Sequence, residues 1–428
     1  MDRSKRMIII SKWLVLSLAA GAMAGSASAL FLFGLNAVTD ARIGQPWLLW
    51  LLPAGGALIS WLYAKYGGDS AKGNNLIIDQ AYGGGTHVAV PLRMAPLVLI
   101  GTWMTHLLGG SAGREGTAVQ MGGSLSEFIG RRLQLSQAGR STLLMCGVSA
   151  GFGSVFGTPA AGALFGVELL AAGGIARYNA LLPCIVSAYA GSWVTEAWGI
   201  EHSHYSMGPI PEFSWLLLGQ VALAAVLFGL AAMLFSELTH TLKRGFAVIV
   251  PHTVLRAFVG GTVIIALVYA VGTRDYIGLG LPLMKESFME AVSPAAFALK
   301  TLFTSVTLGA GFQGGEVTPL FVIGSTLGSA LAGLLHLSVP FLAGIGLVSV
   351  FSGAANTPIA CTIMGIELFG IEGAGYVLLS CMIAYAASWH SGIYTSQRYS
   401  PLKRWMLRLP AGHTRAMLLE MRTRNKKG

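Results

Sequence analysis

Charged residues are scarce in this chain of 428 residues. Asp, Glu, Lys and Arg together make up 11% of it, whereas an average soluble domain contains about 25%. Hydrophobic residues account for 54% of the chain, and its mean hydropathy is +0.65. A chain with so few polar side chains cannot cover a water-exposed surface. The composition therefore excludes an ordinary soluble protein and predicts a polytopic membrane protein.

Motifs of catalysis and of ATP binding are also missing. The sequence contains no H-E-x-x-H, G-x-S-x-G or Walker loop, so neither hydrolysis nor ATP-driven pumping has support. The stretch Glu201-His202-Ser203-His204 has a faint metal-ligand pattern, but histidines in a polar loop are usually solvated. We therefore predict no metal and no cofactor. The four cysteines show no close pairing and lie in apolar stretches, so we expect free buried thiols at Cys146, Cys184, Cys361 and Cys381.

Positive charge is concentrated at the two ends of the chain, whose formal net charge is +10. Three basic residues precede the first apolar run, namely Arg3, Lys5 and Arg6. Eight more crowd the C-terminal tail: Lys403, Arg404, Arg408, Arg415, Arg422, Arg424, Lys426 and Lys427. The positive-inside rule then predicts that both termini are cytoplasmic. Basic segments beside membrane spans usually contact lipid headgroups, so we expect membrane lipid, and not nucleic acid, as their partner.

The N-terminal stretch imitates a cleavable signal peptide, because a basic start and an apolar run are followed by Ala27-Ser28-Ala29. The apolar run, however, continues beyond this triplet through Leu30-Phe31-Leu32-Phe33. We therefore predict that the segment is kept as a first membrane helix.

Long apolar segments follow one another along the chain. They lie at about residues 7–38, 47–64, 94–110, 142–172, 179–198, 214–237, 246–272, 295–312, 319–352 and 357–389. Several are too long or too short for one simple span, and glycines and prolines such as Gly157, Pro159, Gly353 and Pro358 interrupt them. We expect tilted, closely packed helices, some of which end inside the membrane. Backbone that breaks off at that depth should line a cavity.

An internal repeat organises the chain. Thr158-Pro159 is followed nine residues later by Glu168, and Thr357-Pro358 by Glu367 at the same spacing. A Gly-x-Glu-x-Thr element also recurs about two hundred residues later. Both landmarks keep their order, which indicates two homologous halves that meet near residues 199–213. The pattern alone leaves open whether the halves run parallel or inverted. Because Glu168 and Glu367 are placed equivalently, we expect both to anchor helix ends.

Each Gly-x-Glu-x-Thr element carries one carboxylate, Glu115 in residues 113–117 and Glu316 in residues 314–318. A carboxylate at membrane depth costs several kcal/mol unless a partner, a proton or water compensates, so a functional role is the default hypothesis. Broken helices offer unpaired N–H groups and the positive end of the helix dipole, which bind anions. A bound anion and Glu115 would suit the same donors. Protonation of Glu115 should then release those donors and couple proton movement to anion movement.

Structural roles are the alternative for each of these candidates. Glu115 could be an ion-paired structural acid, and a helix N-terminus alone could hold Glu316. Asn74, after Gly73, could be a helix cap, and Tyr394 could belong to an interfacial aromatic belt. An intramembrane enzyme with Glu115 and Glu316 as an acid pair is a further alternative. It would need a convergent nucleophile or metal set, and the sequence shows none.

Three motifs in order resemble the CLC family of chloride channels and proton-coupled anion exchangers. Gly113-Arg114-Glu115-Gly116-Thr117 is similar to the Gly-Arg-Glu-Gly-Pro motif with the gating glutamate of that family. The stretch 73–77 (Gly-Asn-Asn-Leu-Ile) stands where the family has Gly-Ser-Gly-Ile-Pro, and 314–319 stands where it has Gly-x-Phe-x-Pro. The resemblance covers about residues 10–400.

The resemblance implies an all-α membrane protein with broken, tilted helices in two inverted-topology halves. One membrane domain would span residues 1–428, with halves at about 10–200 and 212–400 and a short basic cytoplasmic tail at 403–428. It also implies a homodimer with one pathway per subunit, in a bacterial inner membrane. Glu115 becomes the gating, proton-carrying glutamate, and Asn74 and Tyr394 contact the anion. Glu316 and Thr318 line the pathway, and the remaining anion-site positions are Gly113, Gly116, Thr117, Gly315 and Val317.

Departures from the family pattern narrow the function. Asn74 replaces the usual anion-site serine, Thr117 replaces proline, and Glu316 with Thr318 replaces the phenylalanine motif. This combination resembles the fluoride/proton antiporters of the family, and short amide and hydroxyl donors suit the strongly hydrated fluoride ion. Leu169 stands where proton-coupled members keep an internal glutamate, so Glu316 is our candidate for the proton route. A chloride/proton antiporter or a passive anion channel is the alternative.

Overall fold

The computed structural model describes residues 3–83, 89–171, 179–203, 205–410 and 412–418. His204 and the basic residues Arg422, Arg424, Lys426 and Lys427 lie outside these ranges, and the side chains of residues 3–6 are not described. Within the ranges the chain is mostly helical, and β-pairing is confined to isolated bridges.

Most helices of the described residues fall into two series of eight. The first series is α1 (Arg3–Gly44), α2 (Leu52–Leu62), α3 (Asn74–Ala81), α4 (Met94–Leu107), α5 (Glu115–Arg132), α6 (Gln137–Phe156), α7 (Pro159–Ala171) and α8 (Leu181–Ala197). The second is α9 (Trp215–Ile249), α10 (Thr253–Val271), α11 (Leu281–Glu286), α12 (Ala296–Gly309), α13 (Val317–Leu335), α14 (Val339–Ala355), α15 (Pro358–Phe369) and α16 (Ala374–Ala387). Each helix of the first series has its counterpart about two hundred residues later. Short helices η1 (Pro46–Leu51), η2 (Tyr63–Gly67) and η3 (Gly68–Lys72) flank α2, and α17 (Pro401–Leu407) follows α16.

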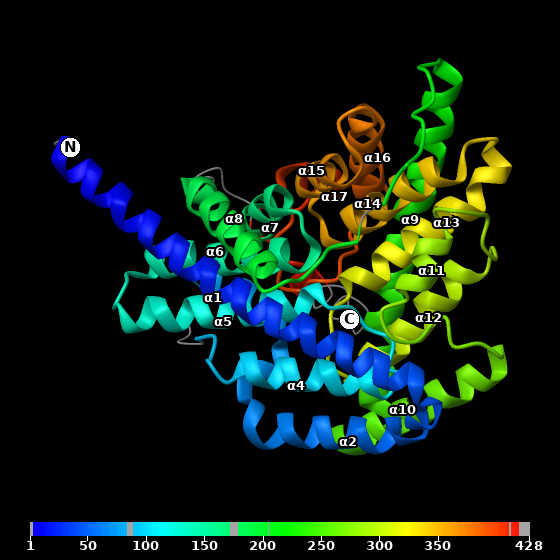
Figure 1. The fold of residues 1–428 in the computed structure, drawn as a ribbon, viewed down its shortest axis with the longest axis horizontal. Coiled ribbons are helices and arrows are strands. Elements are labelled where there is room, and N and C mark those ends of the chain that lie inside the picture. The colour runs from blue at the N-terminus through cyan, green and yellow to red at the C-terminus, as the bar shows by residue number, and fades with distance from the viewer. Residues whose placement is uncertain (1–2, 84–88, 172–178, 204, 411, 419–428) are drawn as a thin grey trace.

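The two series lie side by side, and they meet along several helix pairs. Figure 1 shows the first series, coloured blue to green, mainly on the left, and the second, green to orange, on the right. Helices α2 and α10 pack against each other at one edge, and α7 packs against α15 near the middle. Among the described residues, five helical segments are long and apolar enough to cross a membrane, and several shorter apolar helices accompany them. The predicted all-α polytopic membrane fold with broken helices is confirmed.

Helix breaks occur at matching positions of the two halves. Helix α6 ends at Phe156 and is capped by Gly157, whose φ is 76°, and α7 begins at Pro159. Helix α14 ends at Ala355 and is capped by Asn356, whose φ is 58°, and α15 begins at Pro358. A left-handed residue ends a helix, and proline is favourable in the first turn of the next, so the two predicted interruptions form by the same local chemistry.

Close helix packing is also duplicated. A Cβ placed on Gly122 of α5 would lie 2.2 Å from the carbonyl oxygen of Gly147 in α6. In the second half, a Cβ on Gly324 of α13 would lie 2.1 Å from the carbonyl oxygen of Gly346 in α14. Only glycine allows backbones to approach this closely, as in other membrane helix pairs. The four cysteines lie in this packed interior as free, buried thiols, as expected.

Two glutamates join the halves by capping each other's helices. Glu168 of α7 accepts hydrogen bonds from the N–H groups of Ile359 and Ala360, at 3.1 and 2.8 Å, in the first turn of α15. Glu367 of α15 accepts hydrogen bonds from Ala160 and Ala161 of α7, at 2.8 and 2.7 Å. Because each helix end lies at the other's beginning, the two helices run antiparallel, as inverted halves require. The prediction that both glutamates anchor helix ends is confirmed.

Candidate functional site

Three helices begin at the predicted site. Asn74 is the first residue of α3, Glu115 the first of α5, and Glu316 precedes the first residue of α13. Their meeting point is Gly116, where a Cβ would lie 3.2 Å from Asn74 Nδ2 and 3.5 Å from Glu316 Oε2. The same Cβ would be 2.9 Å from Gly315 Cα, so a side chain at Gly116 would clash with backbone. The structure thus brings together residues from three motifs that are far apart in sequence.

A pair of backbone hydrogen bonds holds the two Gly-x-Glu-x-Thr elements together. The N–H of Gly113 donates to the Gly315 carbonyl at 2.6 Å, and the N–H of Gly315 donates to the Gly113 carbonyl at 2.8 Å. The resulting bridge is antiparallel. It places the start of α5 next to the start of α13, so the N-terminal ends of two helix dipoles meet at one place.

The Glu115 side chain is fully buried and crosses from the first half to the second. Its Oε2 atom accepts a hydrogen bond from the Thr318 hydroxyl at 2.6 Å and another from the Thr318 N–H at 2.9 Å. Its Oε1 atom has no hydrogen bond but forms an ion pair with Arg114, whose Nε atom lies 3.5 Å away. The carboxylate therefore occupies donors of the α13 N-terminus that could equally serve an anion.

Two further buried polar atoms at this place have no hydrogen bond. Glu316 Oε2 is a buried atom without a hydrogen bond, and so is the Oδ1 atom of Asn74. The N-cap of α3 is Gly73, and no side chain caps that helix, so the alternative that Asn74 serves only as a helix cap is wrong. Asn74 Nδ2 instead lies beside Gly116, where an amide donor can face an anion.

The other residues predicted for the anion site differ in whether their side chains face that site. Tyr394 is 3% exposed, which contradicts the alternative of an interfacial belt residue, and it is close enough to Glu115 and Glu316 to interact with both electrostatically. Val317 is buried at the start of α13. The Thr117 hydroxyl, in contrast, pairs with Thr102 of α4 at 2.8 Å. Thr117 can therefore contribute its backbone to the site while its side chain holds α5 to α4.

A buried lysine that the sequence analysis did not single out fixes the loop before Glu115. Lys300 of α12 is fully buried, and its Nζ atom donates to Ser111 Oγ at 3.0 Å. It also donates to the carbonyl oxygens of Tyr276 and Gly278, at 3.2 and 2.9 Å. These bonds tie the segment before Gly113 to the second half. A lone lysine within the apolar stretch 295–312 is the sequence feature that could have identified it.

The position that carries an internal glutamate in the resemblance is aliphatic here. Leu169 is 1% exposed, and its carbonyl oxygen accepts a hydrogen bond of 3.4 Å from the Tyr82 hydroxyl. The neighbouring Glu168 is engaged in capping α15. Neither residue offers a free carboxylate at this point of the structure.

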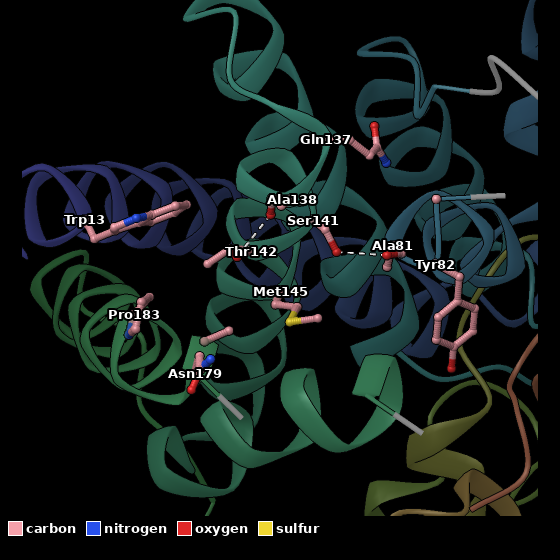
Figure 2. A pocket seen from close by; sticks show the side chains of 12 residues that line it. Trp13, Ala81, Tyr82, Gln137, Ala138, Ser141, Thr142, Met145, Asn179 and Pro183 are labelled. Atoms are coloured by element: carbon pink, nitrogen blue, oxygen red, sulfur yellow. Dashed lines mark hydrogen bonds between the residues drawn. The ribbon is translucent and has the colours of Figure 1, made fainter. Parts of the chain in front are cut away.

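A wider cavity of about 480 Å³ lies elsewhere, between α1, α3, α6 and α8 (Figure 2). Figure 2 shows Trp13, Tyr82, Met145 and Pro183 around it, with Ser141 bonded to the Ala81 carbonyl at 2.8 Å. It shares no lining residue with the predicted site. Residues 84–88 and 172–178, adjacent in sequence to its lining, are outside the described ranges, so we assign no role to this cavity.

Comparison with known proteins agrees with the geometry. A family model described as "Voltage gated chloride channel" matches residues 55–389. A "Chloride/fluoride channel protein" of Pseudomonas syringae pv. tomato is 48% identical over 396 residues, which cover 91% of this chain and 87% of the relative.

Two solved structures resemble the whole fold. One is a CLC-type fluoride/proton antiporter, with a TM-score of 0.87, 33% identity and coverage of 91% of this chain and 98% of that one. The other is a slow cyanobacterial Cl⁻/H⁺ antiporter, with a TM-score of 0.78 and 20% identity over 92% of this chain and 98% of that one. The latter likeness concerns the fold alone. From the motifs, the inverted halves and these matches together, the chain belongs to the voltage-gated chloride channel (CLC) family.

Proposed function

We propose that this protein is a secondary active antiporter that exports fluoride from the cytoplasm in exchange for entering protons. The observation that carries the proposal is the burial of Glu115 against two Thr318 donors. An ionised Glu115 holds these donors. When the carboxyl group is protonated it becomes a weaker acceptor, and an anion can take the donors in its place.

Fluoride is favoured by two kinds of donor near Glu115: the Asn74 amide, which lies beside Gly116, and the Thr318 hydroxyl, which is bonded to the Glu115 carboxylate. The Asn74 amide and the Thr318 hydroxyl can give the short hydrogen bonds that replace the hydration shell of a small anion. Glu316 would repel an anion unless protonated, and its Oε2 atom has no hydrogen-bond partner. We assign Glu316 to the proton route because Leu169 offers no titratable group. The names of the Pseudomonas relative and of the fluoride/proton antiporter support this reading.

The proposed setting is the bacterial inner membrane, with both termini in the cytoplasm and the chain paired as a homodimer with one pathway per subunit. Membrane lipid is the expected partner of its apolar and basic surfaces. Hydrogen fluoride crosses membranes as a neutral acid and dissociates in the cytoplasm, so an exporter driven by protons removes the anion that accumulates.

Chloride/proton exchange or passive anion flow is the alternative, and the word chloride in the name of the Pseudomonas relative favours testing it. The test uses purified protein in liposomes loaded in parallel with fluoride or chloride, with an anion electrode and an internal pH dye. We expect fluoride efflux to exceed chloride efflux and to carry protons inward. Chloride efflux of equal rate, or anion efflux with no pH change, would contradict the proposal.

A further inference from the structure

A small cavity of about 20 Å³ is lined by Tyr394 and mainly by other residues of the segment that follows α16. We call it the C-terminal pocket; its lining includes Tyr394, Gln397, Lys403 and Arg415. A volume of this size holds a single water-sized ligand. Because Tyr394 also belongs to the predicted anion site, the pocket adjoins the proposed pathway.

Two buried cations line the pocket. Lys403 of α17 is 1% exposed and Arg415 is 2% exposed, although both belong to the basic tail predicted from the sequence. Arg415 is paired with Glu237 at 2.6 Å, but no Asp or Glu is among the residues that line the pocket. Burial, together with repulsion from Arg415, lowers the pKa of Lys403 to about 7. An ammonium that lacks a counter-charge is expected to respond in this way.

Lys403 fixes the orientation of two amide side chains next to it. Its Nζ atom can only donate, and it bonds to Asn356 Oδ1 at 2.5 Å and to Ser388 Oγ at 2.9 Å. The NH₂ group of Asn356 must therefore point the other way, and it donates to Gln397 Oε1 at 3.3 Å. In this chain of hydrogen bonds from Lys403 through Asn356 to Gln397, the NH₂ group of Gln397 is the last donor. Gln397 Nε2 is buried and has no hydrogen-bond partner.

A second unpartnered donor comes from Arg415. Its Nη1 atom donates to the Gly392 carbonyl and its Nη2 atom to Glu237, whereas its Nε atom is buried without a partner. Gln397 Nε2 and Arg415 Nε are thus two unsatisfied donors in the lining of the pocket. A water molecule would bring two O–H donors that need acceptors of their own, and a cation would bring positive charge, whereas an anion needs only donors. Leaving both donors empty would cost free energy that an anion removes.

We propose that the C-terminal pocket binds one small monovalent anion of the fluoride type, held by Gln397 Nε2 and Arg415 Nε and neutralised by Lys403. The role of this pocket as a waiting position for the transported ion beside Tyr394 rests on the proposed function. The binding of an anion in the pocket does not depend on that function. A substrate ion captured there would be next to the pathway before Tyr394 and Asn74 receive it.

The experiment is a calorimetric titration of the purified full-length protein in detergent with sodium fluoride at constant ionic strength. We expect Gln397→Glu to remove one bound fluoride per chain or to weaken it by about tenfold or more, because a carboxylate replaces the free NH₂ donor at nearly constant shape. Gln134→Glu makes the same change at an exposed position and should bind fluoride as the wild type does. Thermal unfolding checks that each variant is folded. The variant Lys403→Met, which removes the buried charge, should weaken the same binding event.

The outcomes separate this proposal from the proposed function. If Gln397→Glu and Lys403→Met both bind fluoride as the wild type does, the pocket is occupied by water only and the proposal falls, even where proton-coupled transport is intact. If Gln397→Glu binds one fluoride fewer than the wild type, but the wild type shows no proton-coupled transport, the pocket proposal stands and the proposed function falls.

Discussion

The hydroxyl and the backbone N–H of Thr318 both donate to one oxygen atom of Glu115, at 2.6 and 2.9 Å. The acid comes from the first half of the chain and both donors come from the second. Neither motif alone is therefore a complete site, and the antiparallel bridge between Gly113 and Gly315 sets their distance. Any anion that replaces the carboxylate would have to be bound by the same threonine.

Thr318→Val removes the hydroxyl donor and keeps the branched shape. A hydrogen bond to a charged group contributes about 1.5–3 kcal/mol, so the ionised form of Glu115 that is bound to Thr318 should be destabilised by roughly that much. We expect proton-coupled exchange in liposomes to slow, and its pH–rate profile to move to higher pH, because protonation then competes with a weaker interaction. Thr318→Ser keeps the hydroxyl and serves as the control. Identical pH–rate profiles for all three proteins would show that the hydroxyl does not hold the carboxylate.

Glu316→Ala removes the carboxyl group at the beginning of α13, whose buried Oε2 atom has no hydrogen bond. We expect transport to be inhibited or its pH dependence to change, because only one of the two carboxyl groups beside Gly116, that of Glu115, then remains. The measurement is fluoride efflux at several pH values together with proton uptake. Glu286→Ala, at the end of α11, is a control on the same half of the chain. Unaltered antiport in Glu316→Ala would leave Glu316 a structural role only.

Asn74→Ser replaces an amide donor with the shorter hydroxyl that the family resemblance would have there. The Asn74 Nδ2 atom lies beside Gly116, and a serine hydroxyl cannot reach as far. We expect the ratio of fluoride to chloride efflux to fall several-fold. Asn179→Ser makes the same change at an exposed position, and its ratio should equal that of the wild type. A ratio that does not change in Asn74→Ser would remove this residue from the selectivity argument.

Glu168→Gln and Glu367→Gln should act on stability. Each substitution replaces one of the two carboxylate oxygens that accept hydrogen bonds at a helix N-terminus. A cap of this kind typically contributes about 0.5–2 kcal/mol to the free energy of unfolding. We expect each variant to unfold at a lower temperature in detergent and the two to lower it by similar amounts, since their contacts are equivalent. Transport per folded molecule should be retained. Unchanged stability with lost proton coupling would instead assign Glu168 to the proton route.

The sequence allowed the duplicated fold and a helix-anchoring role of Glu168 and Glu367 to be predicted, because both depend on residues that recur in fixed order. Gly157 and Pro159 break a helix by local chemistry, and so do Asn356 and Pro358. Such local effects can be read without knowing the neighbours. The inverted arrangement of the halves came only from the family resemblance.

Contacts between the halves could not be read in the same way. That Thr318 receives Glu115, and that the Thr117 hydroxyl faces Thr102 instead of the site, depends on how the helices cross. Lys403 and Arg415 looked like parts of a solvated tail because basic residues cluster there. They are buried because the segment after α16 folds back on the body of the protein, where Glu237 and Asn356 meet them.

The most direct test asks whether fluoride movement drives protons through Glu115. Liposomes containing the protein receive an outward fluoride gradient at equal pH on both sides, and the internal pH is recorded. The account predicts that protons accumulate inside against their own gradient with the wild-type protein and that Glu115→Gln abolishes this uptake. Fluoride efflux without proton uptake in the wild type, or proton uptake that survives Glu115→Gln unchanged, would contradict it.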